Sequence, residues 1–177
     1  MQSFTNPMEL MQIVPAFPPA DLDTDRTGDW VSMKNYEWCV IYIHKAAGTA
    51  GDDISILTEQ ATDVAGTSAK ALTFTKLYYK VGATALTAVG TWSTVTGTAT
   101  GDLDTVTAFG SDLVADTGEA VFAVVFKASD LDVSNGFDCL RWSCEGDDLS
   151  NPAIGASAYI LFGPRQASAA MLSAIVD

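Results

Sequence analysis

The feature that most constrains the fold is a run of seven residues, 38–44 (WCVIYIH), which contains neither Gly nor Pro. Aromatic and β-branched side chains dominate the run, and such side chains favour strands because they fit the pleated surface of a sheet. Side chains alternate along a strand, so this one has two faces. One face holds Trp38, Val40, Tyr42 and His44, and the other holds Cys39, Ile41 and Ile43. Because both faces are mostly apolar, we expect a central strand that is covered on both sides.

Several other segments have strand character. They are residues 54–59, 71–81, 87–100, 120–127, 137–144 and 156–162. Residues 120–127 (AVFAVVFK) repeat the doubly apolar pattern, whereas residues 87–100 are rich in threonine, whose hydroxyl tolerates solvent, and are expected at an edge. One helical turn is expected over residues 128–133, and a short helix or an extended end over residues 166–176.

Seven or eight strands at irregular spacing, with Gly-rich turns and no sustained 3.6-residue period, predict a mainly β single domain. A β-sandwich is the architecture we expect; a jelly roll is one form of it, and a barrel is the alternative. No repeat is visible, which argues against propellers and solenoids. The alternation predicts nine buried side chains: Trp38, Val40, Ile41, Ile43, Phe122, Val124, Phe126, Leu140 and Ile160.

Residues 1–20 are expected to form an extended N-terminal arm ahead of a β-sandwich domain of residues 21–177. The prolines that argue against regular structure are Pro7, Pro15, Pro18 and Pro19. The arm is too apolar for a solvated tail and therefore needs a surface, either its own domain or a neighbouring molecule. Deleting residues 2–17 is accordingly expected to leave the domain folded and to weaken assembly. Residues 21–29 (DLDTDRTGD) are expected to form an acidic loop.

The charge balance disfavours two classes of partner, nucleic acids and anionic membranes. The chain has 22 acidic and nine basic residues, a net charge of −13. Repulsion from phosphates disfavours binding to nucleic acid and to anionic membranes. No apolar run approaches the roughly 20 residues of a membrane span. The first residues lack the pattern of a signal peptide, so we expect a protein that is made and assembled inside a cell.

His44 is the sole histidine and the first candidate for catalysis. A Ser–His–Asp arrangement would need it, but no G-x-S-x-G turn accompanies it. Carboxylate pairs for glycoside hydrolysis cannot be selected from 22 acids without geometry. Neither GTAG nor GTATG has the lysine and helix start of a phosphate-binding loop. We therefore expect no enzyme, no catalytic residue and no cofactor, with His44 in packing or at an interface.

Asp21, Asp23 and Asp25 have the spacing that opens an EF-hand loop. The sixth position is Arg26 where glycine is needed, and the twelfth is Ser32 in place of the bidentate glutamate, so an EF-hand is excluded. A looser Ca²⁺ site that uses these residues, or Asp102 and Asp104, is left open beside the preferred interpretation of a solvated acidic loop. With no C-x-x-C and one histidine, zinc is not expected.

The three cysteines are Cys39, Cys139 and Cys144. The spacing of Cys139 and Cys144 places them on opposite faces of one strand, so a disulfide between them is not expected. Three thiols cannot all pair, and buried free thiols are the preferred interpretation.

Three phrases together resemble a group of tailed-bacteriophage and prophage virion proteins. They are residues 28–36 (GDWVSMKNY), 61–72 (ATDVAGTSAKAL) and 162–177 (FGPRQASAAMLSAIVD). The resemblance implies a small β-domain in which the middle phrase links two strands and the last phrase closes the chain. It also implies a capsid decoration (cement) protein or another repeated head component, with tail proteins in the same group. It supplies no catalytic motif.

The resemblance and the physical features imply a virion location, with the major capsid protein and copies of the chain itself as partners. An assembly component needs apolar surfaces and no chemistry, which suits this composition. Two other classes stay open. One is a tail or receptor-binding module that binds carbohydrate, for which Trp92, Tyr78 and Tyr79 are the candidate aromatics. The other is a small β-fold enzyme.

Overall fold

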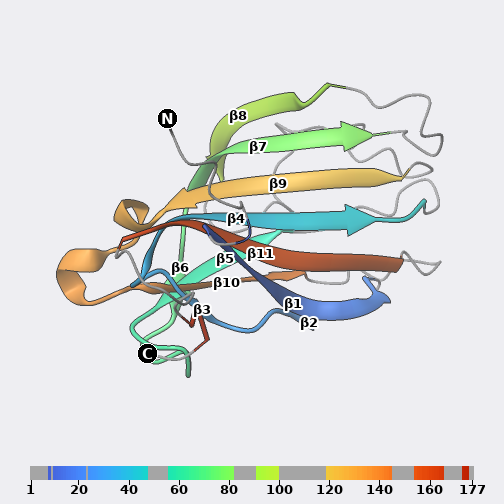
Figure 1. Ribbon diagram of the computed structural model, residues 1–177. Helices are drawn as coiled ribbons and strands as arrows, with labels where there is room; N and C mark the ends of the chain where they lie inside the picture. Colours follow the sequence, from blue (N-terminus) through green and yellow to red (C-terminus); the bar gives the residue numbers. More distant parts are fainter. Residues whose placement is uncertain are drawn as a thin grey trace.

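The computed structural model describes residues 8, 10–22, 24–47, 56–81, 91–99, 119–144, 154–165 and 173–175. Within these residues two antiparallel sheets pack face to face, as Figure 1 shows. The prediction of a mainly β chain with a sandwich architecture is confirmed; the jelly-roll form stays a prediction.

The larger sheet contains the expected central strand. In spatial order its six strands are β1 (Met11–Asp21), β11 (Ile154–Pro164), β4 (Tyr36–Lys45), β9 (Ala120–Lys127), β7 (Phe74–Val81) and β8 (Ser93–Ala99). β4 pairs antiparallel with both β11 and β9 along nearly its whole length. The run WCVIYIH thus lies in the middle of the sheet, with β9, the second doubly apolar strand, beside it.

The smaller sheet covers one face of the larger one. Its strands are β2 (Arg26–Thr27), β10 (Cys139–Cys144), β5 (Leu57–Ala61) and β6 (Lys70–Ala71), with β3 (Val31–Ser32) also paired to β10. Two 3₁₀ turns, Ala128–Asp130 and Val133–Asn135, stand where one helical turn is predicted.

The core lies between the sheets, and it receives six of the nine side chains predicted to be buried. They are Ile41, Ile43, Phe122, Val124, Phe126 and Leu140. The prediction is wrong for Trp38, Val40 and Ile160, which are only half-buried. These three belong to the other face of the larger sheet, which the described part of the chain does not cover. Alternation identifies the side chains that share a face, but not which face another element covers.

The prediction that prolines prevent regular structure near the N-terminus is wrong for residues 11–20. They form most of β1, an edge strand paired with β11. Proline lacks the N–H that a ladder needs, and an edge strand tolerates it because one side has no partner strand. The register shifts between Pro15 and Phe17 and again between Phe17 and Ala20. Residues 1–7 and residue 9 lie outside the described residues.

β1 is attached to its own domain by inward side chains. Ala16 is 3% exposed, and the ring of Phe17 lies 5.2 Å from that of Trp142 in the core. Of the two surfaces considered for this segment, residues 11–20 therefore use the domain itself.

Other predicted elements are shifted or divided in the structure. The strand expected at residues 54–59 is described as β5, and residues 54 and 55 lie outside the described part. The threonine-rich strand is β8, at the edge of the larger sheet as predicted. The predicted loop at residues 21–29 contains β2, and the predicted connection at residues 60–70 leads into β6. Strands of two residues are too short to show the alternation of side chains from which strands are predicted.

The C-terminal phrase lies mostly outside the described residues. Of residues 166–176, the structure describes 173–175. Ala174 is 1% exposed, and its carbonyl accepts a hydrogen bond of 2.7 Å from the N–H of Ser32. The expected helix over this segment is therefore untested outside residues 173–175.

Candidate functional site

The most unusual surface is the side of the larger sheet that faces away from the smaller one, here called the outer face. Cross-strand partners share a face, so the strand registers define its rows. The rows are Met11–Phe162–Trp38–Lys127, Ile13–Ile160–Val40–Val125, Pro15–Ala158–Tyr42–Ala123–Tyr78–Thr94, and Ala156–His44–Val121–Lys80. An antiparallel sheet with one face in water normally shows polar residues there. On β1, β11, β4 and β9 these positions are mostly apolar.

The apolar side chains of the outer face are accessible. Ile13 is 47% exposed, and Val40, Ile160 and Phe162 are half-buried. Large contiguous apolar surfaces are uncommon on monomers and mark interaction sites. The outer face therefore has the character of a contact surface.

Three lysines lie on the outer face, each with its ammonium group above an aromatic ring. The distance from Nζ to the ring centroid is 4.5 Å for Lys127 on Trp38, 4.7 Å for Lys76 on Tyr78 and 4.8 Å for Lys80 on Trp92. The ring quadrupole attracts the cation, and the aliphatic stem covers apolar surface. The positive charges of this face therefore gather on its β9–β7–β8 side.

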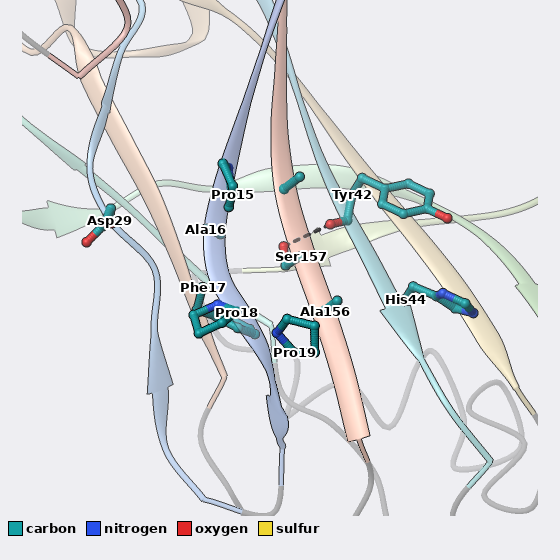
Figure 2. Close-up of a pocket in the computed structure, with 11 residues that line it drawn as sticks. Pro15, Ala16, Phe17, Pro18, Pro19, Asp29, Tyr42, His44, Ala156 and Ser157 are labelled. Carbon is teal, nitrogen blue, oxygen red and sulfur yellow. Dashed lines mark hydrogen bonds between the residues drawn. The ribbon is translucent and has the colours of Figure 1, made fainter.

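A groove follows β11 across the outer face (Figure 2). The methyl side chains of Ala156 and Ala158 form its floor, because β11 places alanine at successive outward positions. On one side stand prolines of β1, and on the other stand Tyr42 and His44 of β4. The cavity measures about 590 Å³. In Figure 2 the rings of Tyr42 and His44 extend away from β11, which leaves the floor open.

A second hollow of about 400 Å³ continues the groove toward the start of β11. It shares Pro19, His44 and Ala156 with the first and extends to Glu119 and Ile154. The two hollows form one mostly apolar trough beside the β4 ridge of Trp38, Val40, Tyr42 and His44, with Asp29 and Glu119 also among its lining residues.

His44 pairs with a residue that sequence reasoning did not select. Its Nε2 is hydrogen-bonded to Oε1 of Glu119, just before β9, and the side chains are 44% and 32% exposed. A separation of 75 residues offers no sequence signal, because only the pairing of β4 with β9 brings the two together. Ser157, between the two floor alanines, is buried, and its hydroxyl donates a 2.8 Å hydrogen bond to the carbonyl of Tyr42. Ser157 thus joins β11 to β4, and the arrangement suits apolar contact more than nucleophilic chemistry.

The aspartates considered for Ca²⁺ are only partly described. The carbonyl of Asp21 accepts a 2.9 Å hydrogen bond from Nε of Arg26, and Asp23, Asp102 and Asp104 lie outside the described residues. Within the described part of the chain, no group of three His, Cys, Asp or Glu side chains is placed to hold a metal ion.

The structure separates the aromatic residues considered for carbohydrate binding. Tyr78 and Trp92 both contact lysines of the outer face, whereas Tyr79 packs against the core. Trp92 is 44% exposed. Adjacent residues of a strand point to opposite faces, so Tyr78 and Tyr79 cannot line the same surface.

All three cysteines are buried free thiols. Cys139 packs with Trp30 and Ala61, whereas Cys144 belongs to the main core between the sheets. The predicted opposite-face placement of Cys139 and Cys144 is therefore confirmed. Burial raises the pKa of the Cys39 thiol well above its ordinary value, which opposes formation of the reactive thiolate.

A polar cluster surrounds Asp132 at the turn before β10. Its carboxylate accepts a 2.5 Å hydrogen bond from Lys70 and further bonds from Asn135 and Ser134. Lys70, followed by Asn135, lowers the pKa of Asp132 to about 2. Lys70 also lies over the ring of Phe137, 4.0 Å from its centroid. Because Asp132 bonds to Lys70 at β6 and to Ser134 and Asn135 in its own turn, we interpret the cluster as a structural tie between β6 and this turn.

No described helix is long and apolar enough to cross a membrane. Comparison with known proteins finds no matching family model, no matching curated protein and no matching solved structure. The outer face and its groove are therefore the features from which function has to be inferred.

Proposed function

We propose that the chain is a non-enzymatic structural component of a tailed-phage virion, of the capsid decoration type. In this role it assembles with the major capsid protein and with copies of itself, and it is located in the virion. The observation that carries the proposal is the accessible apolar outer face, which spans β1, β11, β4 and β9. Exposed apolar surfaces of this kind mark interaction sites, so we expect a partner to bind and cover this face.

The charge distribution supports an assembly role. The rows of the outer face contain two lysines, Lys127 and Lys80, and no acidic residue, although the chain has 22 acidic residues. Charged residues are depleted at the centres of protein interfaces, because their desolvation is costly. A strongly acidic remainder suits a position outside a DNA-filled shell, because like charges repel.

The sequence resemblance supports the virion assignment in particular. Residues 28–36, 61–72 and 162–177 resemble phrases of tailed-phage virion proteins. In the fold, the middle phrase runs from the end of β5 through β6, and the last begins at the end of β11. Both positions agree with what the resemblance implies.

The number of copies in purified particles tests the proposal. We expect quantitative mass spectrometry to find hundreds of copies, because decoration sites repeat with the symmetry of the capsid. When purified protein is added to particles that lack it, we expect the protein to bind and to sediment with them. A count of single digits to dozens would indicate the tail or a vertex. A protein absent from particles and unable to sediment with them would contradict the proposal.

A tail or receptor-binding module that binds carbohydrate is the second candidate. The observation that favours it is the placement of Trp92 and Tyr78 on an accessible surface, with Trp92 44% exposed. Sugars stack on such rings, and lysine ammonium groups donate to hydroxyls. Tight binding on a glycan array that is lost in Trp92→Ala would favour this candidate.

A further inference from the structure

We propose that the outer face is covered by the outer face of a second copy, in a dimer whose two-fold axis runs parallel to the strands between β4 and β11. The result would be a four-layer sandwich. This inference rests on the proposed function, because it names the partner that covers the same surface.

The first reason is electrostatic. Two copies that each carry a net charge of −13 repel one another, so self-association requires a surface without acidic groups. The rows of the outer face meet that condition. Three acidic residues lie at its border: Asp29 lines the groove, Asp130 lines a hollow that Lys76 also lines, and Glu119 is hydrogen-bonded to His44.

The second reason is that the face is self-complementary in shape. The β4 ridge lies next to the trough over β11, and register pairs Tyr42 with Ala158 and His44 with Ala156. A two-fold axis parallel to the strands exchanges these neighbouring positions. It therefore lays Tyr42 of one copy over Ala158 of the other, and His44 over Ala156. Each copy thus fills the other's groove.

The third reason is the position of the lysines. In this arrangement β9 of one copy covers β1 of the other, and β7 and β8 extend beyond the overlap. Lys76 and Lys80 then lie at the rim of the interface, and Lys127 lies at the end of β9, at the end of the overlap. Stable interfaces have an apolar centre and a polar rim, as this arrangement does.

The fourth reason is size. Four strands of 8–11 residues overlap in each copy. With ~4.8 Å between strands and ~3.3 Å per residue, this four-strand part of the sheet has a flat area of roughly 600 Å². Side chains make the solvent-accessible area of this surface larger than its flat area. The area buried in each copy therefore approaches the ~800 Å² per partner of a standard stable interface.

Analytical ultracentrifugation of the full chain tests the proposal. We expect a species of twice the 18.6 kDa chain mass. Ala158→Arg places a long cation in the groove and should convert the protein to monomer. Thr94→Arg, on the same face but outside the overlap, is the matched control and should leave the dimer intact. Thermal melting establishes that each variant is folded. A monomeric wild-type protein, a dimeric Ala158→Arg variant or a monomeric Thr94→Arg variant would each overturn the proposal.

Cysteine cross-linking tests the axis even if Ala158→Arg does not fold. The native cysteines are buried, so introduced surface thiols react selectively. A short thiol-to-thiol reagent should link Tyr42→Cys to Ala158→Cys in a mixture of the two proteins, and in higher yield than in either protein alone. A mixture of Thr94→Cys and Ala158→Cys should give no dimer linked between position 94 of one protein and position 158 of the other. Equal yields in all samples would overturn the geometry.

Binding to particles that lack the protein separates this inference from the proposed function. A wild-type monomer that binds particles would overturn the dimer alone. A wild-type dimer that does not bind them would overturn the virion role alone.

Discussion

Gly66 illustrates how single residues shape the loop between β5 and β6. Its φ is +82°, in the left-handed region that favours glycine, and a Cβ there would lie 2.5 Å from Nε1 of Trp30. The carboxylate of Asp63 accepts hydrogen bonds of 3.0 and 2.9 Å from the N–H groups of Ala65 and Thr67. The loop is thereby closed over Trp30, whose other contacts include the guanidinium of Arg141.

Two alanine variants separate backbone strain from this close contact. Gly136 has the same left-handed backbone, with φ of +83°, but a Cβ there would meet nothing within 4 Å. Gly136→Ala should destabilise the fold by about 1 kcal/mol, the cost of the left-handed region for an L-residue. Gly66→Ala should cost about 1–3 kcal/mol more, because Trp30 has to move. Denaturant unfolding measures both values, and equal losses would contradict the assigned contact.

At the scale of elements, β1 determines how the N-terminal region is attached. Antiparallel pairing with β11 holds one side of the strand, and the prolines occupy an edge where fewer N–H groups are needed. Proline also blunts an open edge against pairing with other chains. β8, at the opposite edge of the sheet, has neither proline nor charge.

Truncation distinguishes β1 from the residues before it. Deleting residues 2–7 should leave the melting temperature close to that of the full chain, because β1 is retained. Deleting residues 2–17 removes the ladder to β11 and the contact of Phe17 with Trp142. Phe17 is partly buried, so loss of its contact should cost about 1–3 kcal/mol, and loss of the ladder adds to this. The melting temperature should therefore fall by about 6 °C or more.

Equal melting temperatures for the two truncations would show that β1 contributes little to stability. That result would restore the expectation that residues 1–20 act as an arm. Particle binding by the shorter truncation then tests whether residues 2–7 take part in assembly.

At the scale of the whole molecule, charge and apolar surface are segregated. The outer face carries lysines and apolar residues, whereas the net charge of the chain is −13. Apolar contact over this face thus acts against a long-range repulsion between copies.

Salt should therefore strengthen self-association. The Debye length is about 10 Å at 0.1 M ionic strength, so added salt screens the repulsion between acidic surfaces and leaves the apolar contact in place. Sedimentation equilibrium at increasing NaCl should show a falling dissociation constant. A dissociation constant that rises with salt would indicate an interface held by ion pairs and would contradict the apolar one.

The sequence by itself determined the mainly β class and the central positions of β4 and β9. It also determined which side chains of each strand share a face. These properties follow from local rules: β-branched and aromatic residues favour strands, and side chains alternate with period two. The opposite placement of Cys139 and Cys144 was predictable for the same reason.

Only the tertiary structure decided which apolar face is covered and which is open. The prediction was right for Ile41 and Ile43 and wrong for Val40 and Ile160, although all four are alike in sequence. The difference depends on where the smaller sheet packs. The groove and the His44–Glu119 pair also depend on strands that are distant in sequence and adjacent in space. Such juxtapositions are set by strand order, which residue periodicity does not encode.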